Sequence, residues 1–359
     1  MGSADRNDPI LVTDYRQLTS DWAQSVLQLH DPGATVQSVA LVNLHIGTTT
    51  RIRLVVEHTS TAIARHWFVK LPSRDWKARI ITALPRLLQT EVRFYQHLAA
   101  QVPMQIPTCL AARSSWGRGA ILVLADLTEQ GGSVGTAADT LDLPQAQEAV
   151  VQLARFHACF RHDTAIQDRY PWLADSVRRL EDLLGSILAV PLMKRGLKKA
   201  GNLIPPELHE PALRYAKNRK KAMVFLGAAP QTLTHHDCHP GNLFRQADGS
   251  IGFLDWQLVR LGDGIGDLAY LLATTLSPED RQSHETDLLA QYADTAGLRG
   301  KISPEELMTR YRAHCCYAFE AMVVTLAIGD MMELSSNHEL IRRTAAVVQE
   351  LDCFSSLPV

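Results

Sequence analysis

The residues best suited to chemistry lie in two short segments of the C-terminal half. Asp237 and Asn242 are five residues apart, and Asp255 follows thirteen residues later, at the end of an apolar segment. In phosphoryl transfer, a carboxylate orients the attacking hydroxyl and accepts its proton, while an amide oxygen and a second carboxylate hold Mg²⁺ against the phosphates. Metal and positioning supply most of the catalysis, because charge on the transferred group must be neutralised. The spacing therefore predicts a phosphoryl-transfer site.

Around these residues the chain resembles the aminoglycoside phosphotransferase/choline kinase superfamily. The His-x-Asp-x-x-x-x-Asn loop of that superfamily is matched by His235, Asp237 and Asn242. Its metal-binding Asp, which stands between an apolar residue and Trp, is matched by Asp255. The resemblance implies that Asp237 is the catalytic base and that Asn242 and Asp255 bind magnesium. It also implies that His235 braces the loop, and that Asp267, in the following Gly-Ile-Gly-Asp segment, is a structural anchor for it.

A second group of candidate residues lies in the N-terminal part, where a nucleotide would bind. Lys70 lies in a Trp-Phe-Val-Lys-Leu segment that looks like the third strand of a kinase small lobe, whose lysine contacts the α- and β-phosphates. Glu91 begins a helical segment twenty-one residues later and could pair with Lys70. Residues 121–127, which include Leu124 and Asp126, resemble the hinge whose backbone would hydrogen-bond adenine. ATP and Mg²⁺ are the cofactors that this resemblance implies.

The chain departs from the family pattern at several positions. The phosphate loop contains one glycine, Gly47, followed by Thr48 and Thr49, although backbone amides and threonine hydroxyls can still cradle phosphate. The family usually has Gly where His236 stands, so His236 is either a contact for substrate or phosphate, or a passive neighbour. An apolar residue is usual where Cys238 stands. The hinge contains Ala in place of the usual acid before Asp-Leu.

The elements that must position these residues divide into two parts. Segments rich in β-branched residues predict strands at 36–44, 50–57, 65–71, 108–112 and 120–124, with a helix at 87–100. Apolar periodicity then predicts helices at 144–162, 172–188, 206–226, 278–296, 304–331 and 338–351, interrupted by strands at 232–234, 242–245 and 251–254. The expected class is α+β, a bilobal protein-kinase-like fold with a small β-rich N-terminal lobe and a larger, mostly helical C-terminal lobe. We expect a nucleotide-binding lobe at 1–124, a hinge at 125–133 and a catalytic and acceptor-binding lobe at 134–359.

The composition bounds the class of protein. The 359 residues are 46% hydrophobic and 21% charged, which is typical of a globular protein with a substantial core. A formal net charge of −2 argues against a nucleic-acid partner. The six cysteines are scattered without a CxxC pair, which favours free thiols in a reducing compartment. The N-terminus has no apolar signal segment, and the most apolar stretch, 321–328, is too short to span a bilayer. The expectation is a cytoplasmic protein without membrane contact, and its oligomeric state stays open.

The acceptor is the least constrained part of this interpretation. A pocket for an aminoglycoside polycation should be strongly acidic. Glu320 is the only acid in the apolar run from Tyr317 to Leu326, so a mixed pocket with few charges fits better, and Glu320 is a candidate substrate contact in it. The Asp-Trp-Gln segment at 255–257 and the helical insert at 172–226 resemble the ecdysteroid-kinase-like, or CHK-domain, branch. That branch implies a bulkier, less cationic alcohol; a steroid-like alcohol, another natural product, an antibiotic and an amino alcohol all stay open.

Two other classes of function compete with a kinase. The run His-His-Asp-Cys-His at 235–239 could be read as a zinc site of a hydrolase, but adjacent residues of an extended segment point to opposite sides. A catalytically silent kinase-like binding module would require the loss of Asp237, Asn242, Asp255 or Lys70, and all four are present. The favoured reading is therefore an ATP-dependent phosphotransferase that moves the γ-phosphate to a hydroxyl of a small, non-protein acceptor.

Overall fold

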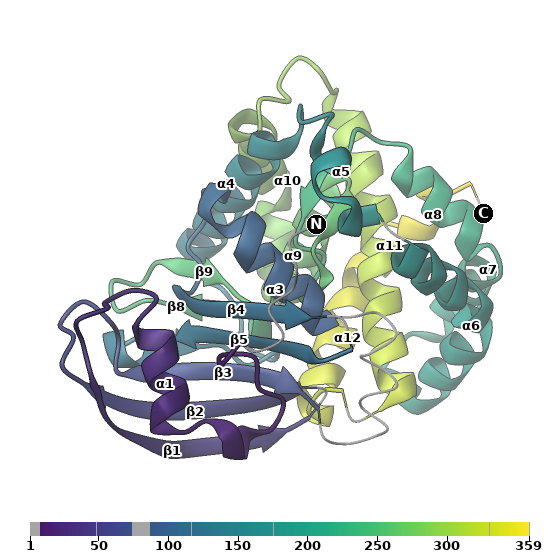
Figure 1. Cartoon of the computed structure of the whole chain (residues 1–359). Coiled ribbons are helices and arrows are strands. Elements are labelled where there is room, and N and C mark those ends of the chain that lie inside the picture. Colours follow the sequence, from purple (N-terminus) through teal and green to yellow (C-terminus); the bar gives the residue numbers. More distant parts are fainter. Residues whose placement is uncertain are drawn as a thin grey trace.

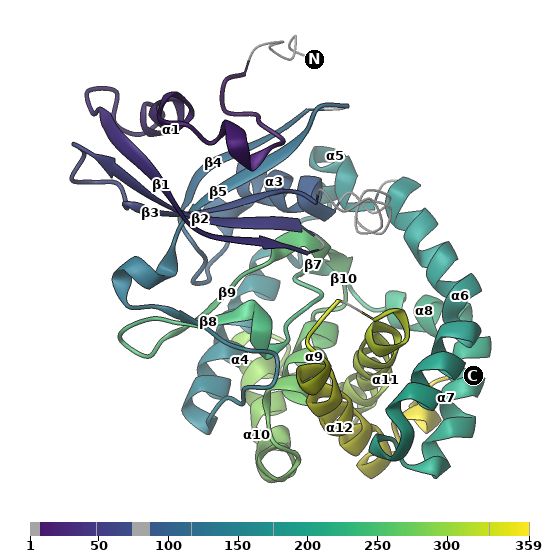
Figure 2. The ribbon, with the colours of Figure 1, turned by 90° about the horizontal axis from the view of Figure 1, so that it is seen from below.

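The chain folds into two lobes, one built around a sheet and one built mainly of helices (Figures 1 and 2). The computed structural model describes residues 8–47, 49–73, 87–115, 117–174, 176–329 and 331–358, without the side chains of residues 176–181. This arrangement confirms the α+β, bilobal protein-kinase-like class expected from the sequence.

In the described residues, the N-terminal lobe is a five-stranded antiparallel sheet that carries a helix on each face. Its strands lie in the order β1-β2-β3-β5-β4. They span Val36–Ile46 (β1), Thr49–His58 (β2), His66–Pro72 (β3), Cys109–Ser115 (β4) and Gly119–Ala125 (β5). Helix α1 (Ser20–Leu27) contacts β1 and β4, whereas α3 (Leu87–His97) contacts β3, β4 and β5.

Side-chain alternation along the strands separates the core of this lobe from the cleft. Trp67, Val69 and Leu71 of β3 are buried in the apolar cluster that also contains Trp22 of α1. Because successive residues of a strand point to opposite faces, Lys70 lies on the other side, toward α3 and the second lobe. The same alternation puts Ile52, Leu54 and Val56 of β2 in the α1 cluster and leaves its arginines facing the cleft.

The C-terminal lobe packs its helices around α9 and α11. The helices are α4 (Leu143–Phe160), α5 (Ile166–Arg169), α6 (Ser176–Ala200), α7 (His209–Lys217), α8 (Arg219–Gly227), α9 (Gly264–Thr275), α10 (Pro278–Thr295), α11 (Pro304–Ile328) and α12 (Leu334–Glu350). Helix α11 contacts α6, α9 and α12. None of the helices in the described part of the chain has both the length and the apolar character needed to span a bilayer.

Short strands between α8 and α9 carry the loops that matter for chemistry. Strand β7 (Thr232–Thr234) pairs with β10 (Arg260–Gly262), and β8 (Leu243–Arg245) pairs with both β9 (Ile251–Phe253) and β6 (Ser133–Val134). All three pairings are antiparallel; β8 and β9 are consecutive and form a hairpin, whereas the loops from β7 to β8 and from β9 to β10 connect the two small sheets.

Several sequence predictions need correction at their ends. The helix predicted for 172–188 spans Ser176–Ala200, with Pro191 inside it, and the helix predicted for 206–226 is two helices separated at Asn218. The helix predicted for 304–331 ends at Ile328, where Gly329 takes a φ of 82°. Helices α1 and α9 were not predicted: α1 has only eight residues, and nearly every residue of α9 is buried, so α9 shows no polar face that would reveal its period.

Candidate active site

The loop between β7 and β8 presents Asp237 with both carboxylate oxygens oriented. Asn242 Nδ2 donates to Asp237 Oδ2 at 2.9 Å and to the Asp237 carbonyl oxygen at 3.0 Å. The Tyr270 hydroxyl donates to Asp237 Oδ1 at 3.0 Å. A carboxylate held by one donor on each oxygen has little rotational freedom, so the geometry suits a group that must meet an acceptor hydroxyl in one orientation.

His235 is fully buried and uses both ring nitrogens inside the loop. Its Nδ1 accepts from the Asp237 backbone N–H at 3.3 Å, so the proton lies on Nε2, which donates to the Leu254 carbonyl at 2.9 Å. Burial lowers the pKa of His235 below its ordinary value, which keeps the ring neutral. His235 thus joins the Asp237 loop to the segment after β9 and does not face an acceptor.

Asp267 of α9 anchors the start of the same loop. Its two oxygens accept backbone N–H groups of His235 at 2.6 Å and His236 at 2.8 Å, and His157 Nε2 lies 3.1 Å away. Burial by itself would raise the pKa of Asp267, but the hydrogen bond and charge of His157 outweigh burial and lower it. Gly264 permits this packing, because a Cβ there would lie 2.5 Å from Tyr292 Oη and 2.7 Å from His157 Nδ1.

The backbone conformation of His236 explains why the family pattern has a glycine at this position. His236 has a φ of 71°, in the left-handed region that glycine adopts without strain. Its backbone is held by Asp267, and its ring lies 4.9 Å from the ring of Tyr317. A side chain at this position therefore projects beside Tyr317, at the edge of the loop between β7 and β8.

Asp255 and Asn242 form a donor set suited to a hard cation. Asp255, with a φ of 66°, follows β9, and the neighbouring Leu254 N–H donates to the Asn242 carbonyl at 2.9 Å. Since Asn242 Nδ2 is used by Asp237, its Oδ1 is the group left for another partner. Carboxylate and amide oxygens are ligands that Mg²⁺ accepts, and it commonly takes one or two from the protein and the rest from phosphates and water. The residues present therefore fit Mg²⁺.

Lys70 joins the sheet of one lobe to the site of the other. Its Nζ lies 2.8 Å and 2.9 Å from the two carboxylate oxygens of Glu91 and 3.1 Å from Asp255 Oδ1. Burial would lower the pKa of Lys70, but the charges of Asp255 and Glu91 outweigh it and raise the pKa. Asp255 responds oppositely: burial would raise its pKa, whereas Lys70 and Arg51 lower it. The cation and the Asp255 carboxylate therefore both stay charged near neutral pH.

These residues line a cavity of about 340 Å³ between the lobes. Its wall combines apolar side chains, those of Phe68, Leu124 and Leu254, with the charged side chains of Lys70 and Asp255. An apolar slot beside a cation and oxygen donors is the division that a nucleobase and its phosphates require.

Other predicted nucleotide contacts lie at the margin of this cavity. Asp126 lines it, but its Oδ1 accepts from Thr128 N–H at 3.0 Å and its Oδ2 lies 3.2 Å from Arg53 Nε. Gly47 and Thr49 close the β1–β2 hairpin outside the lining, and the Gly47 carbonyl accepts from Ser73 Oγ at 2.7 Å. Thr48 lies outside the described residues.

Sequence reasoning missed Arg51, a second cation in this cavity. Arg51 stands opposite Lys70 across β2 and β3, and its guanidinium lies 3.7 Å from Asp255 Oδ2. The signal was present, since Arg51 and Arg53 alternate with the buried Ile52 and Leu54. Alternation alone, however, does not say which residues the exposed face of the strand will meet.

A second and larger cavity, of about 710 Å³, lies in the C-terminal lobe. His236, Tyr270 and Tyr317 line it, together with residues of α6, α8 and β10. Tyr270 was also missed from the sequence, yet it connects this cavity to Asp237, as Asn242 connects the first one. Asp237 lines neither cavity itself, but it is hydrogen-bonded to one lining residue of each and so lies between them.

Glu320, predicted as a substrate contact, is buried between helices. Its Oε2 accepts from the Tyr215 hydroxyl at 2.8 Å, and its Oε1 accepts from Arg219 Nε at 2.6 Å. It is not among the residues that line the second cavity. The carboxylate thus neutralises Arg219, and it presents no free oxygen that we would assign to an acceptor.

The arrangement around 235–239 does not favour the zinc reading. Both ring nitrogens of His235 are used within the loop, and burial raises the pKa of the Cys238 thiol well above its ordinary value. In the part of the chain that the structure describes, no three His, Cys, Asp or Glu side chains converge in a metal-binding arrangement.

Comparisons with known proteins agree with this geometry. The model of the phosphotransferase enzyme family matches residues 55–301. Among solved structures, wild-type aminoglycoside 2'-phosphotransferase-IIIa in complex with GDP is 14% identical, with 91% of this chain and 98% of that chain covered and a TM-score of 0.51. Choline kinase from Cryptosporidium parvum Iowa II is 12% identical, with 94% and 98% covered and a TM-score of 0.54. Plasmodium vivax ethanolamine kinase is 13% identical, with 95% and 91% covered and a TM-score of 0.50. At these identities the structural likeness shows the fold. A comparison with curated proteins found no match.

Proposed function

This chain belongs to the phosphotransferase enzyme family, and on that premise we propose that it transfers the γ-phosphate of ATP to a hydroxyl group of a small molecule. The observation that carries the proposal is the position of Asp237. One carboxylate oxygen is bonded to Asn242 of the first cavity and the other to Tyr270 of the second. A base that must meet both a nucleotide phosphate and an acceptor hydroxyl belongs at such a boundary.

The residues of the first cavity divide the work of holding the nucleotide. Phe68, Leu124 and Leu254 would contact the base, while Lys70 and Arg51 would neutralise phosphate charge. Asn242 Oδ1 and the Asp255 carboxylate would hold Mg²⁺, which supplies charge neutralisation on the phosphate oxygens when bound. We assign residues 1–124 to the nucleotide-binding lobe, 125–133 to the hinge and 134–359 to the catalytic and acceptor-binding lobe.

The transfer step follows from the orientation of Asp237. The acceptor oxygen attacks the γ-phosphorus, the bond from that phosphorus to the bridging oxygen breaks, and ADP leaves. Asp237 accepts the proton of the acceptor hydroxyl. Tyr270 and Asn242 hold the carboxylate in place during this transfer, so most of the contribution of the protein is positioning.

The test is a coupled nucleotide-consumption screen over aminoglycosides, macrolides, amino alcohols, sugars and steroids, run with ATP and with GTP. Asp237→Asn should bind nucleotide normally and lose turnover by roughly 10²–10⁴-fold, as expected when a general base is removed. Asp248→Asn makes the same chemical change at an exposed turn and should keep the wild-type rate. Nucleotide binding without transfer to any acceptor would instead favour a silent binding module and overturn the proposal.

A further inference from the structure

The second cavity is built for an acceptor of a particular chemical class, an inference that rests on the proposed function. We propose that the acceptor is a bulky, largely apolar alcohol that carries no cationic group. The cavity volume of about 710 Å³ is roughly twice that of the nucleotide cavity, at about 340 Å³, and is within the range that encloses a drug-sized molecule. The volume of the cavity does not determine the charge of the acceptor. That charge is determined by the charged residues of the lining.

Two of the three carboxylates among the described lining residues are neutralised by side chains of this protein. Asp182 lies 3.0 Å from Arg260, and Asp263 lies 3.0 Å from His314 and is also bonded to Arg310. Burial would raise the pKa of Asp263, but His314 and Arg310 lower it to about 2, which marks a carboxylate already supplied with cations. Neither of these acids is free to bind an ammonium group of an acceptor.

The third carboxylate belongs to the catalytic loop. Asp267 accepts two backbone N–H groups at 2.6 Å and 2.8 Å and contacts His157, so its oxygens are used to anchor the loop. A polycationic acceptor needs several exposed acids in its site. The described lining of this cavity offers none that lacks a partner of its own.

The cationic residues of the lining also argue against a cationic acceptor. Arg219 is paired with Glu320 at 2.6 Å, whereas the exposed Lys220 makes no hydrogen bond or ion pair with any described residue. Among the described lining residues, the charge that has no partner is therefore positive, and the Asp237 carboxylate beyond Tyr270 already accepts a hydrogen bond on each oxygen. An acceptor with an amine would meet like charge and would lose hydration without gaining a carboxylate partner.

Part of the rim of the cavity is apolar and open to solvent, beside the exposed Asp182 and Lys220. Leu183 of α6 and Val224 of α8 both line the cavity, yet they are 53% and 67% exposed. Next to them, exposed apolar side chains repeat at helical spacing along α6 and continue on α8: Leu184, Ile187, Leu188 and Phe225. The two helices contact each other at one edge of the lobe (Figure 2). An apolar patch that leads into a cavity marks a binding surface for an apolar ligand.

The polar end of the cavity lies at the reacting centre. There Tyr270 contacts Asp237, and the rings of His236 and Tyr317 lie 4.9 Å apart. A molecule with its hydroxyl at this end would place its apolar body against Leu183, Met223 and Val224 of α6 and α8. This placement puts the group that reacts next to Tyr270 and Asp237.

The test uses a matched pair of acceptors on one ring system: a hydroxysteroid without an amine, and its amino-substituted analogue. Nucleotide consumption by the full-length enzyme should give a kcat/KM at least about tenfold higher for the neutral member. Calorimetric binding to Asp237→Asn should give the same order of affinity without turnover, so that the result does not depend on catalysis.

A variant cycle changes the charge of the cavity. Arg260→Gln removes the partner of Asp182 and should shift the preference toward the amine by several-fold, because a carboxylate becomes available. In the double variant Asp182→Asn/Arg260→Gln that gain should disappear. An amine preferred by the wild-type enzyme, or an Arg260→Gln preference equal to that of the double variant, would overturn the inference while leaving the proposed function standing. Absence of turnover with every acceptor would overturn both.

Discussion

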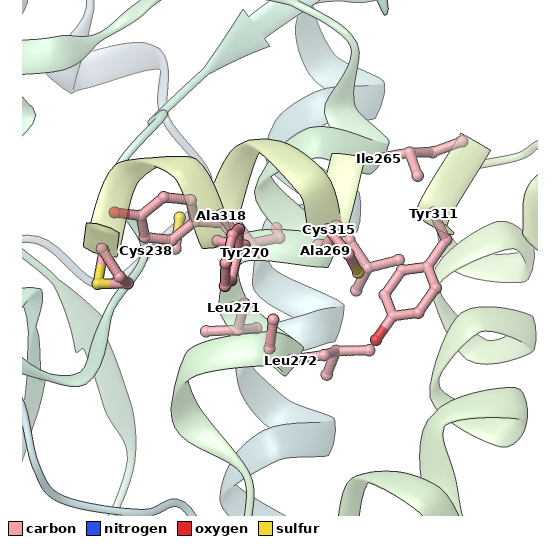
Figure 3. Packing of buried hydrophobic residues seen from close by; sticks show 14 of the residues in the cluster. Cys238, Ile265, Ala269, Tyr270, Leu271, Leu272, Tyr311, Cys315 and Ala318 are labelled. Carbon is pink, nitrogen blue, oxygen red and sulfur yellow. The ribbon is translucent and has the colours of Figure 1, made fainter. Parts of the chain in front are cut away.

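The hydroxyl of Tyr270 lies 3.0 Å from Oδ1 of Asp237, and it reaches that oxygen from the side of the larger cavity. Figure 3 shows Tyr270 among buried side chains, in the same cluster as Cys238 of the catalytic loop and Cys315 of α11. Burial, and then the charge of Asp237, raise the pKa of Tyr270 well above its ordinary value, so the hydroxyl keeps its proton and remains a donor. Tyr270 is therefore a positioning residue for the carboxylate of Asp237.

Removal of that hydroxyl should lower kcat more than it changes KM. In Tyr270→Phe the ring still packs, but Asp237 loses one of its two side-chain donors. A hydrogen bond to a charged group contributes about 1.5–3 kcal/mol, so we expect kcat to fall at least about tenfold. Tyr95→Phe is the matched control, since it removes a buried hydroxyl that has no hydrogen-bond partner among the described residues, and it should leave kcat within about twofold. Equal losses in the two variants would contradict the positioning role.

The pair formed by Lys70 and Glu91 should couple stability to activity. Lys70→Met leaves Glu91, which is 1% exposed, as a buried carboxylate without its cation, at a cost of about 3–5 kcal/mol. The double variant Lys70→Met/Glu91→Gln removes that charge and should recover most of the loss. Urea unfolding measures both. Neither variant should regain phosphoryl transfer, because Lys70 is absent from both and only the arginines of the cavity remain. Unfolding of both variants at the same urea concentration would contradict the argument.

Asp267 should act on the loop through its backbone. Asp267→Asn replaces one accepting oxygen by an NH₂ group, which would face the N–H of His235 or His236. Leaving a buried N–H without an acceptor costs about 1–3 kcal/mol, so we expect a lower Tm and a lower kcat with a nearly unchanged KM for ATP. Asp287→Asn, at an exposed position of α10, should change stability by less than about 0.5 kcal/mol. A Tm for Asp267→Asn equal to that of the wild type would contradict the anchoring role of Asp267.

Stability should fall as the pH falls below about 6.5, in part because of His235. Burial lowers the pKa of His235 in the folded protein, so below the ordinary value of 6.5 the unfolded chain binds a proton that the folded one resists. The unfolded state then binds more protons, and the free energy of unfolding decreases with decreasing pH. His235→Asn can donate and accept without titrating. Thermal unfolding between pH 7.5 and 5.5 should therefore show a smaller decrease for His235→Asn than for the wild type, and parallel curves would contradict the assignment.

Much of the site could be predicted from sequence because its parts are local. Asp237 and Asn242 lie five residues apart in the same loop, so their contact follows from short-range geometry. Lys70 alternates with the apolar residues of its strand, which determines the face on which it lies. To predict these contacts, it is enough to know in which direction a side chain points from its own strand or loop.

Tertiary structure decided which elements meet. Tyr270 reaches Asp237 from thirty-three residues away, and Arg51 approaches Asp255 from the opposite lobe, as no spacing rule predicts. Glu320 shows the reverse, since its acidity suggested a substrate contact while the packing of α11 places it against Arg219. The sequence by itself determined the set of reactive groups and their direction within each strand or loop. Only the packing of distant elements decided which residues of other elements these groups contact. The reason is that a charged side chain pairs with the groups that the packing brings within a few ångströms of it.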